Sequence, residues 1–178
     1  MGAGPQVTIS ELTPDEAERR VGELGALLHA CVQDGASIGF VLPHALSDSQ
    51  AYWSRKVLPQ LRHGGLALLI AQQAGGIAGS VQLDCDTPPN QPHRAEVRKL
   101  LVHPKFRRQG IARALMAAVE ALARRRGRSL ITLDTRTGDA AERLYAELGY
   151  STAGVIPDWC RDTIEDRLDP TTVMYKRL

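Results

Sequence analysis

Residues 94–116 read RAEVRKLLVHPKFRRQGIARALM and combine three local patterns. The apolar residues of 95–102 predict a buried strand that ends at His103-Pro104. A basic turn follows, and a helix begins near Gly110. Apolar residues then recur with the period of a helix face at Ile111, Leu115, Val119 and Leu122. The stretch therefore places the N-terminus of a helix directly after a buried strand.

The first turn of this helix has the properties of an anion-binding site. Its backbone N–H groups lack intrahelical partners, and the helix dipole is positive at that end. Three arginines add positive charge, and two small residues let a large anion approach the backbone closely. The predicted phosphate site comprises Arg107, Arg108, Gln109, Gly110, Ile111, Ala112 and Arg113. Basic residues beside a glycine are also common at helix starts without any ligand, so the pattern alone leaves a solvated turn open.

A second segment, residues 139–150, reads DAAERLYAELGY and follows after an intervening predicted strand. The two segments in this order resemble the GCN5-related N-acetyltransferase (GNAT) superfamily, and the resemblance extends over residues 7–178. In that family the basic turn holds the pyrophosphate of acetyl-CoA, and the later tyrosine protonates the departing thiolate. The resemblance implies an acetyl-CoA-dependent N-acetyltransferase in which Tyr145 is the acid. From the residues alone, Tyr145 can equally face the core of the protein.

Within the family, the chain is most similar to the tabtoxin-resistance acetyltransferases. The similar segments are DGASIGF at 34–40, RAEVRKL at 94–100, LDT at 133–135 and the segment around Tyr145. In the family, the strand before the basic turn separates from the next parallel strand and pairs with the pantetheine arm of the cofactor. The matching positions are Leu100, Leu101 and Val102. Amide groups of an extended ligand pair well with such an exposed strand edge.

Two carboxylates, Glu96 and Asp134, lie in or beside predicted strands that are otherwise poor in acidic residues. A carboxylate in a sheet core is costly unless it is paired or functional, and burial raises its pKa toward the range of a useful base. A structural ion pair of Glu96 with Arg94 or Arg98 is the alternative. The resemblance places both carboxylates in the active site. We expect them to bind or deprotonate an amine, directly or through water.

The segment 35–46 is a predicted loop with an unusually apolar composition. Such a loop either fills the edge of a core or lines a pocket. The resemblance implies that it forms one wall of the acceptor site, and we predict that Ser37 and Phe40 contact the acceptor. Residues 157–170, rich in Asp and Arg, are predicted to be a long connection whose residues 157–169 also belong to the acceptor site.

The remaining patterns predict an α/β fold of the GNAT type, with a central mixed sheet of six to seven strands and about four helices. The expected strands cover 7–10, 66–72, 77–83, 95–102, 130–133, 151–156 and 171–176, with a tight turn over 73–76. The expected helices cover 13–33, 47–62, 110–126 and 140–148. Residues 7–178 are expected to form a single domain, and residues 1–6 an extended or disordered N-terminus.

Composition restricts the class of function. The net charge of +2 gives no reason to expect nucleic-acid or membrane binding. The three cysteines are far apart and form no Cys/His cluster, so we expect no metal and reduced thiols in the cytoplasm. The start of the chain has no signal-peptide pattern. Motifs of nucleotide kinases and dinucleotide-dependent dehydrogenases are absent from the sequence. We expect a monomer or a homodimer.

Three functions remain compatible with these residues. The first is acetyl transfer from acetyl-CoA to the amine of a small molecule, such as an amino-acid-like compound, an antibiotic or a toxin. The second is acetylation of a protein or peptide, which requires a broad and shallow acceptor groove. The third is a catalytically silent module that binds coenzyme A. The apolar loop argues against the second function, and the presence of Tyr145, Glu96 and Asp134 argues against the third.

Overall fold

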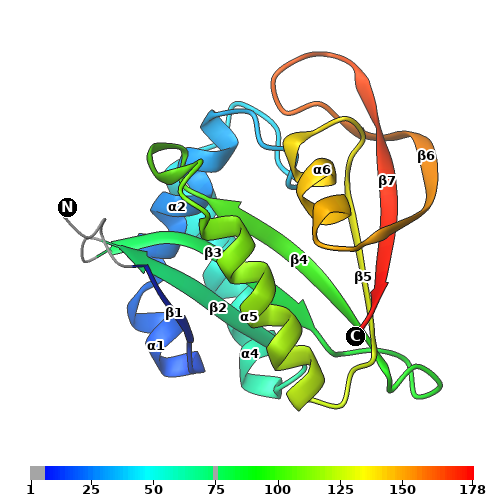
Figure 1. Cartoon of the computed structure of the whole chain (residues 1–178). Helices are drawn as coiled ribbons and strands as arrows, with labels where there is room; N and C mark the ends of the chain where they lie inside the picture. Colours follow the sequence, from blue (N-terminus) through cyan, green and yellow to red (C-terminus); the bar gives the residue numbers. More distant parts are fainter. Residues whose placement is uncertain (1–6, 74–75) are drawn as a thin grey trace, which may run out of the picture.

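The computed structural model describes residues 7–73 and 76–178, which form a seven-stranded mixed sheet with helices on both faces (Figure 1). The strand order is β1-β2-β3-β4-β5-β7-β6, and only β4 and β5 are parallel neighbours. The strands are β1 Thr8–Glu11, β2 Leu66–Gln73, β3 Gly76–Asp84, β4 Arg94–Val102, β5 Leu130–Arg136, β6 Ser151–Arg161 and β7 Leu168–Arg177. The predicted α/β class with a mixed sheet is confirmed. The predictions for residues 1–6 and for the centre of the turn 73–76 lie outside the described residues.

Helices cover the two faces of the sheet unequally. They are α1 Pro14–Arg19, α2 Val21–Gln33, α3 Leu46–Tyr52, a π-helical turn η1 Trp53–Val57, α4 Leu58–His63, a 3₁₀ turn η2 Pro104–Phe106, α5 Ile111–Arg125 and α6 Ala140–Glu147. Alternate residues of β2 belong to different cores, since Ala67 and Leu69 pack with α5 whereas Leu68 and Ile70 pack with α1 to α4. This alternation is the two-residue period of a strand with both faces buried.

Two predicted helices are interrupted. The expected helix over 13–33 is divided at Arg20 into α1 and α2, and the expected helix over 47–62 contains η1. This π-helical turn directly precedes α4, in which Pro59 occupies the first turn. A proline in a helix removes a backbone donor and clashes with the preceding turn, and a π-bulge accommodates such a disruption.

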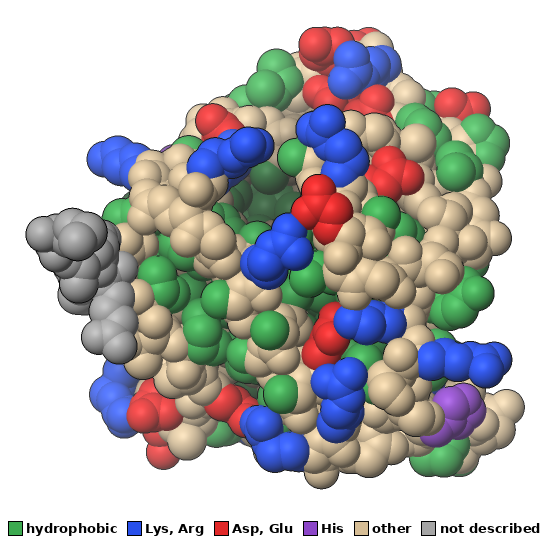
Figure 2. Space-filling model, viewed as in Figure 1, with side chains coloured by type: hydrophobic (Ala, Val, Ile, Leu, Met, Phe, Trp, Pro, Cys, Tyr) green, Lys and Arg blue, Asp and Glu red, His purple; other side chains and the backbone are tan. Residues whose placement is uncertain are grey.

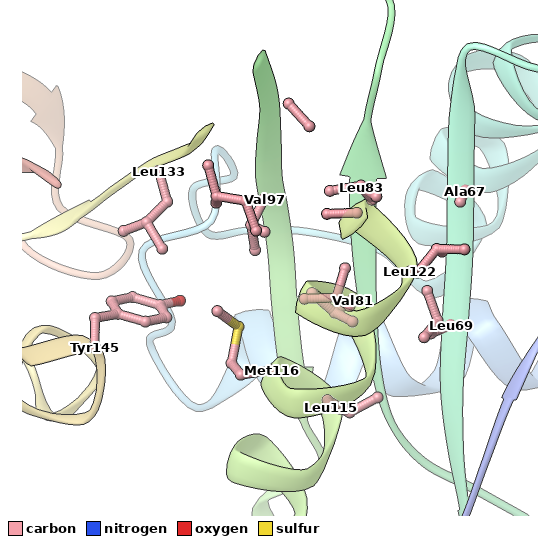
Figure 3. Close-up of a cluster of buried hydrophobic side chains, with 14 of the residues drawn as sticks. Ala67, Leu69, Val81, Leu83, Val97, Leu115, Met116, Leu122, Leu133 and Tyr145 are labelled. Carbon is pink, nitrogen blue, oxygen red and sulfur yellow. The ribbon is translucent and has the colours of Figure 1, made fainter. Parts of the chain in front are cut away.

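The central strand-turn-helix forms as predicted. Gly110 is the N-cap of α5 with φ of 79°, and Gly127, with φ of 70°, follows the helix. The predicted apolar face of α5 is buried against the sheet. Figure 3 shows Leu115, Met116 and Leu122 of α5 pointing toward side chains of β2, β3 and β4. The helix N-terminus is therefore held rigidly at the end of β4.

The parallel pairing of β4 and β5 is short. It comprises only Arg94 with Leu130, Ala95 with Ile131 and Glu96 with Thr132, and beyond these pairs the two strands diverge (Figure 1). On its other edge, β4 has a bulge opposite β3, between the pairs Gln82 with Arg98 and Ser80 with Leu101. Lys99 lies in this bulge with φ of 51°. The second half of β4 therefore has a free edge in the middle of the sheet.

Residues 157–170 do not form the predicted long connection. Most of them extend β6 and β7, which continue to pair through Cys160 with Asp169 and Arg161 with Leu168. A bulge between Ile156 and Cys160 accommodates Pro157 and the positive φ of Asp158. The sequence suggested a loop because β6 is an exposed edge strand, where proline and charged residues are tolerated.

The close approach of α5 to the sheet gives a stability prediction. A Cβ atom added at Gly79 would lie 2.7 Å from the backbone oxygen of Leu101 and 3.1 Å from side-chain atoms of Ile111 and Leu115. We expect Gly79→Ala to lower the free energy of unfolding by about 1–3 kcal/mol, measured by chemical denaturation. Gly22→Ala is the control, because it meets no atom within 4 Å and favours helix α2. Equal stability of the two variants would contradict the prediction.

Candidate active site

A cavity of about 820 Å³ lies between the end of β4 and α6. Figure 2 shows the surface hollowed between the start of α5 and α6, with charged side chains at the rim. The end of α2 closes the cavity on another side. The cavity is lined by Leu100, Leu101, Val102, Arg107, Arg108, Gly110, Ile111, Ala112 and Arg113, all of which the sequence predicted to bind a cofactor.

The backbone at the start of α5 presents unused donors to this cavity. The backbone bonds of the helix begin at Ala114, whose N–H donates to Gly110 O at 3.0 Å. Within the described part of the chain, the N–H groups of residues 108–113 have no hydrogen-bond acceptor. Arg108 and Gly110 both have positive φ, at 62° and 79°. Alternating left- and right-handed residues of this kind form concave groups of N–H donors that bind anions.

Gln109 is the one predicted cofactor residue outside the cavity lining. Its side-chain Oε1 accepts a hydrogen bond from Gln73 Nε2 at 2.9 Å, so the amide is engaged by the end of β2. The backbone N–H of Gln109 has no acceptor in the described part of the chain and remains available for a ligand. The sequence could not show this, because Gln73 and Gln109 are distant along the chain.

Two of the predicted arginines are held by carboxylates from other elements. Arg107 pairs with Asp34 at the end of α2, and Arg113 pairs with Glu147 of α6. All four side chains are substantially exposed. Exposed ion pairs contribute at most about 1 kcal/mol, so a phosphate can replace these carboxylates at low cost. Carboxylates of the protein itself therefore neutralise part of the positive charge at the turn.

The two predicted carboxylates lie on the same face of the sheet. Ala95, Val97 and Leu133 belong to the core under α5, so Glu96 and Asp134 project to the opposite face. The alternative, an ion pair of Glu96 with Arg94 or Arg98, is absent from the described structure. Arg98 binds Asp84 at 2.6 Å, and Arg94 donates to polar side chains. Neither carboxylate lines the cavity beside α5.

The environments of the two carboxylates differ. Partial burial raises the pKa of Glu96, while the nearby Arg98 opposes this shift. Asp134 is exposed, contrary to the expected burial, because β4 has already separated from β5 at this position. Its Oδ2 accepts a hydrogen bond from Thr171 Oγ1 at 3.0 Å. Glu96 is therefore partly shielded from water, whereas Asp134 is solvated.

Tyr145 projects from α6 into the core beside the cavity. Its ring lies near Leu133 and Met116 (Figure 3), and only 6% of the residue is exposed. Burial raises the pKa of the Tyr145 hydroxyl far above its usual value, and the negative charge of Asp134 adds to this shift. A phenol is protonated at neutral pH even at its ordinary pKa, so the Tyr145 hydroxyl has a proton to donate. The neighbouring Leu144, rather than Tyr145, lines the cavity.

The apolar loop over 35–46 packs against the divergent part of β4. The Phe40 ring lies edge-on to Tyr52 at 5.4 Å between centroids, and the Ser37 hydroxyl lies 3.7 Å from Cys160 Sγ. The turn between β6 and β7 holds the loop, because Leu42 N–H donates to Thr163 O and Thr163 Oγ1 donates to Ala36 O, both at 2.9 Å. The loop and the turn between β6 and β7 are therefore joined to each other.

Lys99 and Tyr52 also belong to this region, and sequence reasoning did not identify them. The Lys99 ammonium lies 5.9 Å from the Phe40 ring centroid and 6.0 Å from that of Tyr52. Lys99 reaches the rings only because of the β4 bulge, which has no periodic signature in the sequence. No cluster of metal-binding side chains occurs among residues 7–73 and 76–178. In the same residues, every helix is too short or too polar to cross a membrane.

Comparison with known proteins identifies the family. The model of the acetyltransferase (GNAT) family matches residues 36–150, and the chain belongs to this family. An N-acetyltransferase from Azospirillum brasilense is 34% identical over 122 residues, covering 66% of this chain and 70% of that protein. An acetyltransferase from Pectobacterium atrosepticum is 38% identical over 109 residues, covering 61% and 73%. The protein is thus an acetyltransferase of the GNAT family.

Solved structures share the fold at low sequence identity. An acetyltransferase structure from Acinetobacter baylyi matches with a TM-score of 0.81 and 16% identity, covering 100% of this chain and 95% of the other. The yncA protein from Salmonella typhimurium, solved with its cofactor acetyl-CoA, matches with a TM-score of 0.77 and 18% identity, covering 97% and 94%. These likenesses establish that the seven-stranded sheet and its helices form a GNAT fold.

Proposed function

We propose that this acetyltransferase moves the acetyl group of acetyl-CoA to the amine of a small molecule, such as an amino-acid-like compound, an antibiotic or a toxin. The observation that supports this most is the row of unused N–H groups over 108–113, which faces a cavity of about 820 Å³. The similar Salmonella typhimurium protein binds acetyl-CoA as its cofactor. The resemblance to tabtoxin-resistance acetyltransferases also favours a small acceptor.

Each part of the donor has a matching surface in this proposal. The diphosphate binds the N–H groups at the start of α5, with Arg108 and the exchangeable Arg107 and Arg113 adding charge. The pantetheine arm lies along the free edge of β4 at Leu100, Leu101 and Val102. Strand-like pairing with this edge directs the thioester toward the point where β4 and β5 separate.

The transfer then needs two proton movements. A protonated amine, with a pKa near about 10, must lose a proton before its nitrogen attacks the acetyl carbon. Glu96 accepts that proton, directly or through water, and Asp134 helps to hold the amine. As the C–N bond forms and the C–S bond breaks, the Tyr145 hydroxyl donates its proton to the departing sulfur. The raised pKa of Glu96 suits a base, whereas Tyr145 has a proton to give because a phenol is neutral at pH 7.

The shape of the acceptor side favours a small molecule over a protein. A protein or peptide acceptor requires an open groove, whereas the loop over 35–46 is fastened to the turn between β6 and β7 by two hydrogen bonds. Phe40 and Tyr52 fill part of the remaining space. These contacts hold the loop in place on the side of β4 where Lys99 meets Phe40 and Tyr52.

A substrate screen tests the proposal. Thiol release from acetyl-CoA is measured with amino acids, aminoglycosides and short peptides as acceptors, and acetyl-CoA binding is measured by calorimetry. We expect binding and rapid thiol release with at least one small amine. Binding without release for any acceptor would instead indicate a silent coenzyme A module. Release only with peptides would indicate a protein acetyltransferase, and absence of binding would reject the proposal.

The row of backbone N–H groups over 108–113 gives a separate prediction for the affinity of the protein for acetyl-CoA. Gly110→Ala meets no protein atom within 4 Å but places a side chain at φ of 79°, which costs about 1–2 kcal/mol. Because the backbone relaxes to relieve this strain, the donors shift and the affinity for acetyl-CoA should fall about tenfold or more. Gly127→Ala is the matched control, since it has the same kind of φ and free space at the far end of α5. Calorimetry should show unchanged affinity for the control, and equal losses would argue against the N–H row.

A further inference from the structure

Lys99 is a partly buried ammonium group without a carboxylate partner in the described part of the chain. Its neighbour Arg98 is neutralised by Asp84 at 2.6 Å, whereas Lys99 Nζ lies beside the rings of Phe40 and Tyr52. Two aromatic faces stabilise a cation, but they do not satisfy its three N–H donors. The ammonium therefore keeps unused hydrogen-bonding capacity in a desolvated position.

The backbone at Lys99 is also unfavourable for a lysine. Its φ of 51° lies in the left-handed region, where a side chain with a Cβ atom is strained. Burial lowers the pKa of Lys99, and the positive charge of Arg98 lowers it further. A strained residue that carries an unpaired and partly buried charge destabilises the free protein. Such features persist at sites where a ligand uses them.

Groups of opposite charge surround the site at Lys99: its own ammonium and two carboxylates. Glu96 precedes Lys99 by three residues in β4, and Asp134 lies on the adjacent strand β5. Both carboxylates influence the Lys99 ammonium electrostatically, yet neither forms an ion pair with it. A small molecule between these groups therefore meets negative charge at one end and positive charge at the other. An amine that also carries a carboxylate complements both ends.

We propose that Lys99 binds the carboxylate of the acceptor, which makes the acceptor class a small zwitterion with an amine and a carboxylate. This inference rests on the proposed acetyl transfer and specifies its acceptor. The amine faces Glu96 and Asp134, and the carboxylate forms charge-assisted hydrogen bonds with Lys99 Nζ. Phe40 and Tyr52 hold the ammonium in place and exclude water from the ion pair.

The test compares L-amino acids with the corresponding amino-acid carboxamides as acceptors. The two members of each pair share side chain and amine, and only the carboxylate differs. We expect the wild-type protein to have kcat/KM about tenfold to hundredfold higher for the amino acids, mainly through a lower KM. In Lys99→Met this preference should vanish because the KM for amino acids rises, while the values for carboxamides stay the same. Methionine keeps an unbranched apolar side chain at this position and removes only the charge.

Two further variants separate binding from structure. Lys99→Arg retains the charge and should keep most of the preference for carboxylates. Lys56→Met is the matched control, because Lys56 is exposed on η1 and its removal should leave every kinetic value unchanged. Thermal unfolding confirms that each variant is folded. If Lys99→Met does not fold, two other results decide whether Lys99 binds the carboxylate. These are the preference of the wild-type protein for amino acids over carboxamides and the retention of that preference in Lys99→Arg.

The outcomes separate this inference from the proposed function. Acetylation of carboxamides as efficiently as amino acids by the wild-type protein would overturn the role of Lys99 while leaving acetyl transfer intact. A preference for carboxylates that survives in Lys99→Met would overturn it as well. If the wild-type protein acetylates no amine and binds no acetyl-CoA, the proposed function fails and the inference fails with it.

Discussion

Replacing Tyr145 by phenylalanine is expected to lower kcat about 10²- to 10⁴-fold while leaving the affinity for acetyl-CoA unchanged. The change removes only the hydroxyl group, and the ring keeps its place beside Leu133 and Met116 (Figure 3). The wild-type hydroxyl is protonated at neutral pH, as a phenol is at its ordinary pKa, and burial raises this pKa further. Without it, the departing thiolate must take a proton from water, which slows the breakdown of the thioester.

Tyr150→Phe is the matched control for this experiment. Tyr150 is 4% exposed, and its ring centroid lies 5.8 Å from that of Tyr145 in the same core. Steady-state kinetics and calorimetry with acetyl-CoA are measured for both variants. We expect the control to keep the wild-type kcat. Similar losses in both variants would point to core packing, and full activity of Tyr145→Phe would remove Tyr145 from the mechanism.

The second large effect is expected for Glu96→Gln, which should lower kcat/KM about 10²- to 10³-fold at neutral pH. Glutamine preserves the size of the side chain but cannot accept the proton of the amine. Because burial raises the pKa of Glu96, the wild-type activity should fall as the pH decreases through this raised value. That acid limb of the pH profile should disappear in the variant, and its persistence would assign the base to another group.

The same substitution should affect stability in the opposite direction. A carboxyl group whose pKa is higher in the folded than in the unfolded protein favours folding when protonated. That contribution is lost as the pH rises through the folded-state pKa. Near pH 7 the charged Glu96 therefore opposes folding, so Glu96→Gln should unfold at a slightly higher temperature than the wild-type protein. The exposed Asp134 offers a comparison, since Asp134→Asn should give no such gain.

The amino-acid sequence by itself determined the strand, basic turn and helix of residues 94–116. Hydrophobic periodicity and the glycines at 110 and 127 are local properties, and backbone preferences of adjacent residues produce them directly. The free N–H donors follow from the same local geometry, since any helix N-terminus has them. One cavity is lined by Gly110, Ala112 and the end of β4, because all of them belong to this segment.

Only the tertiary structure decided which distant groups meet. The pairing of Arg107 with Asp34, the contact of Gln109 with Gln73 and the approach of Lys99 to Phe40 each join residues from separate elements. The β4 bulge and the early separation of β4 from β5 depend on how the whole sheet packs. A sequence records local preferences, whereas long-range strand register and side-chain burial arise from the sum of many contacts across the fold. For that reason the strand, turn and helix could be predicted from the sequence, but the surroundings of Lys99 could not.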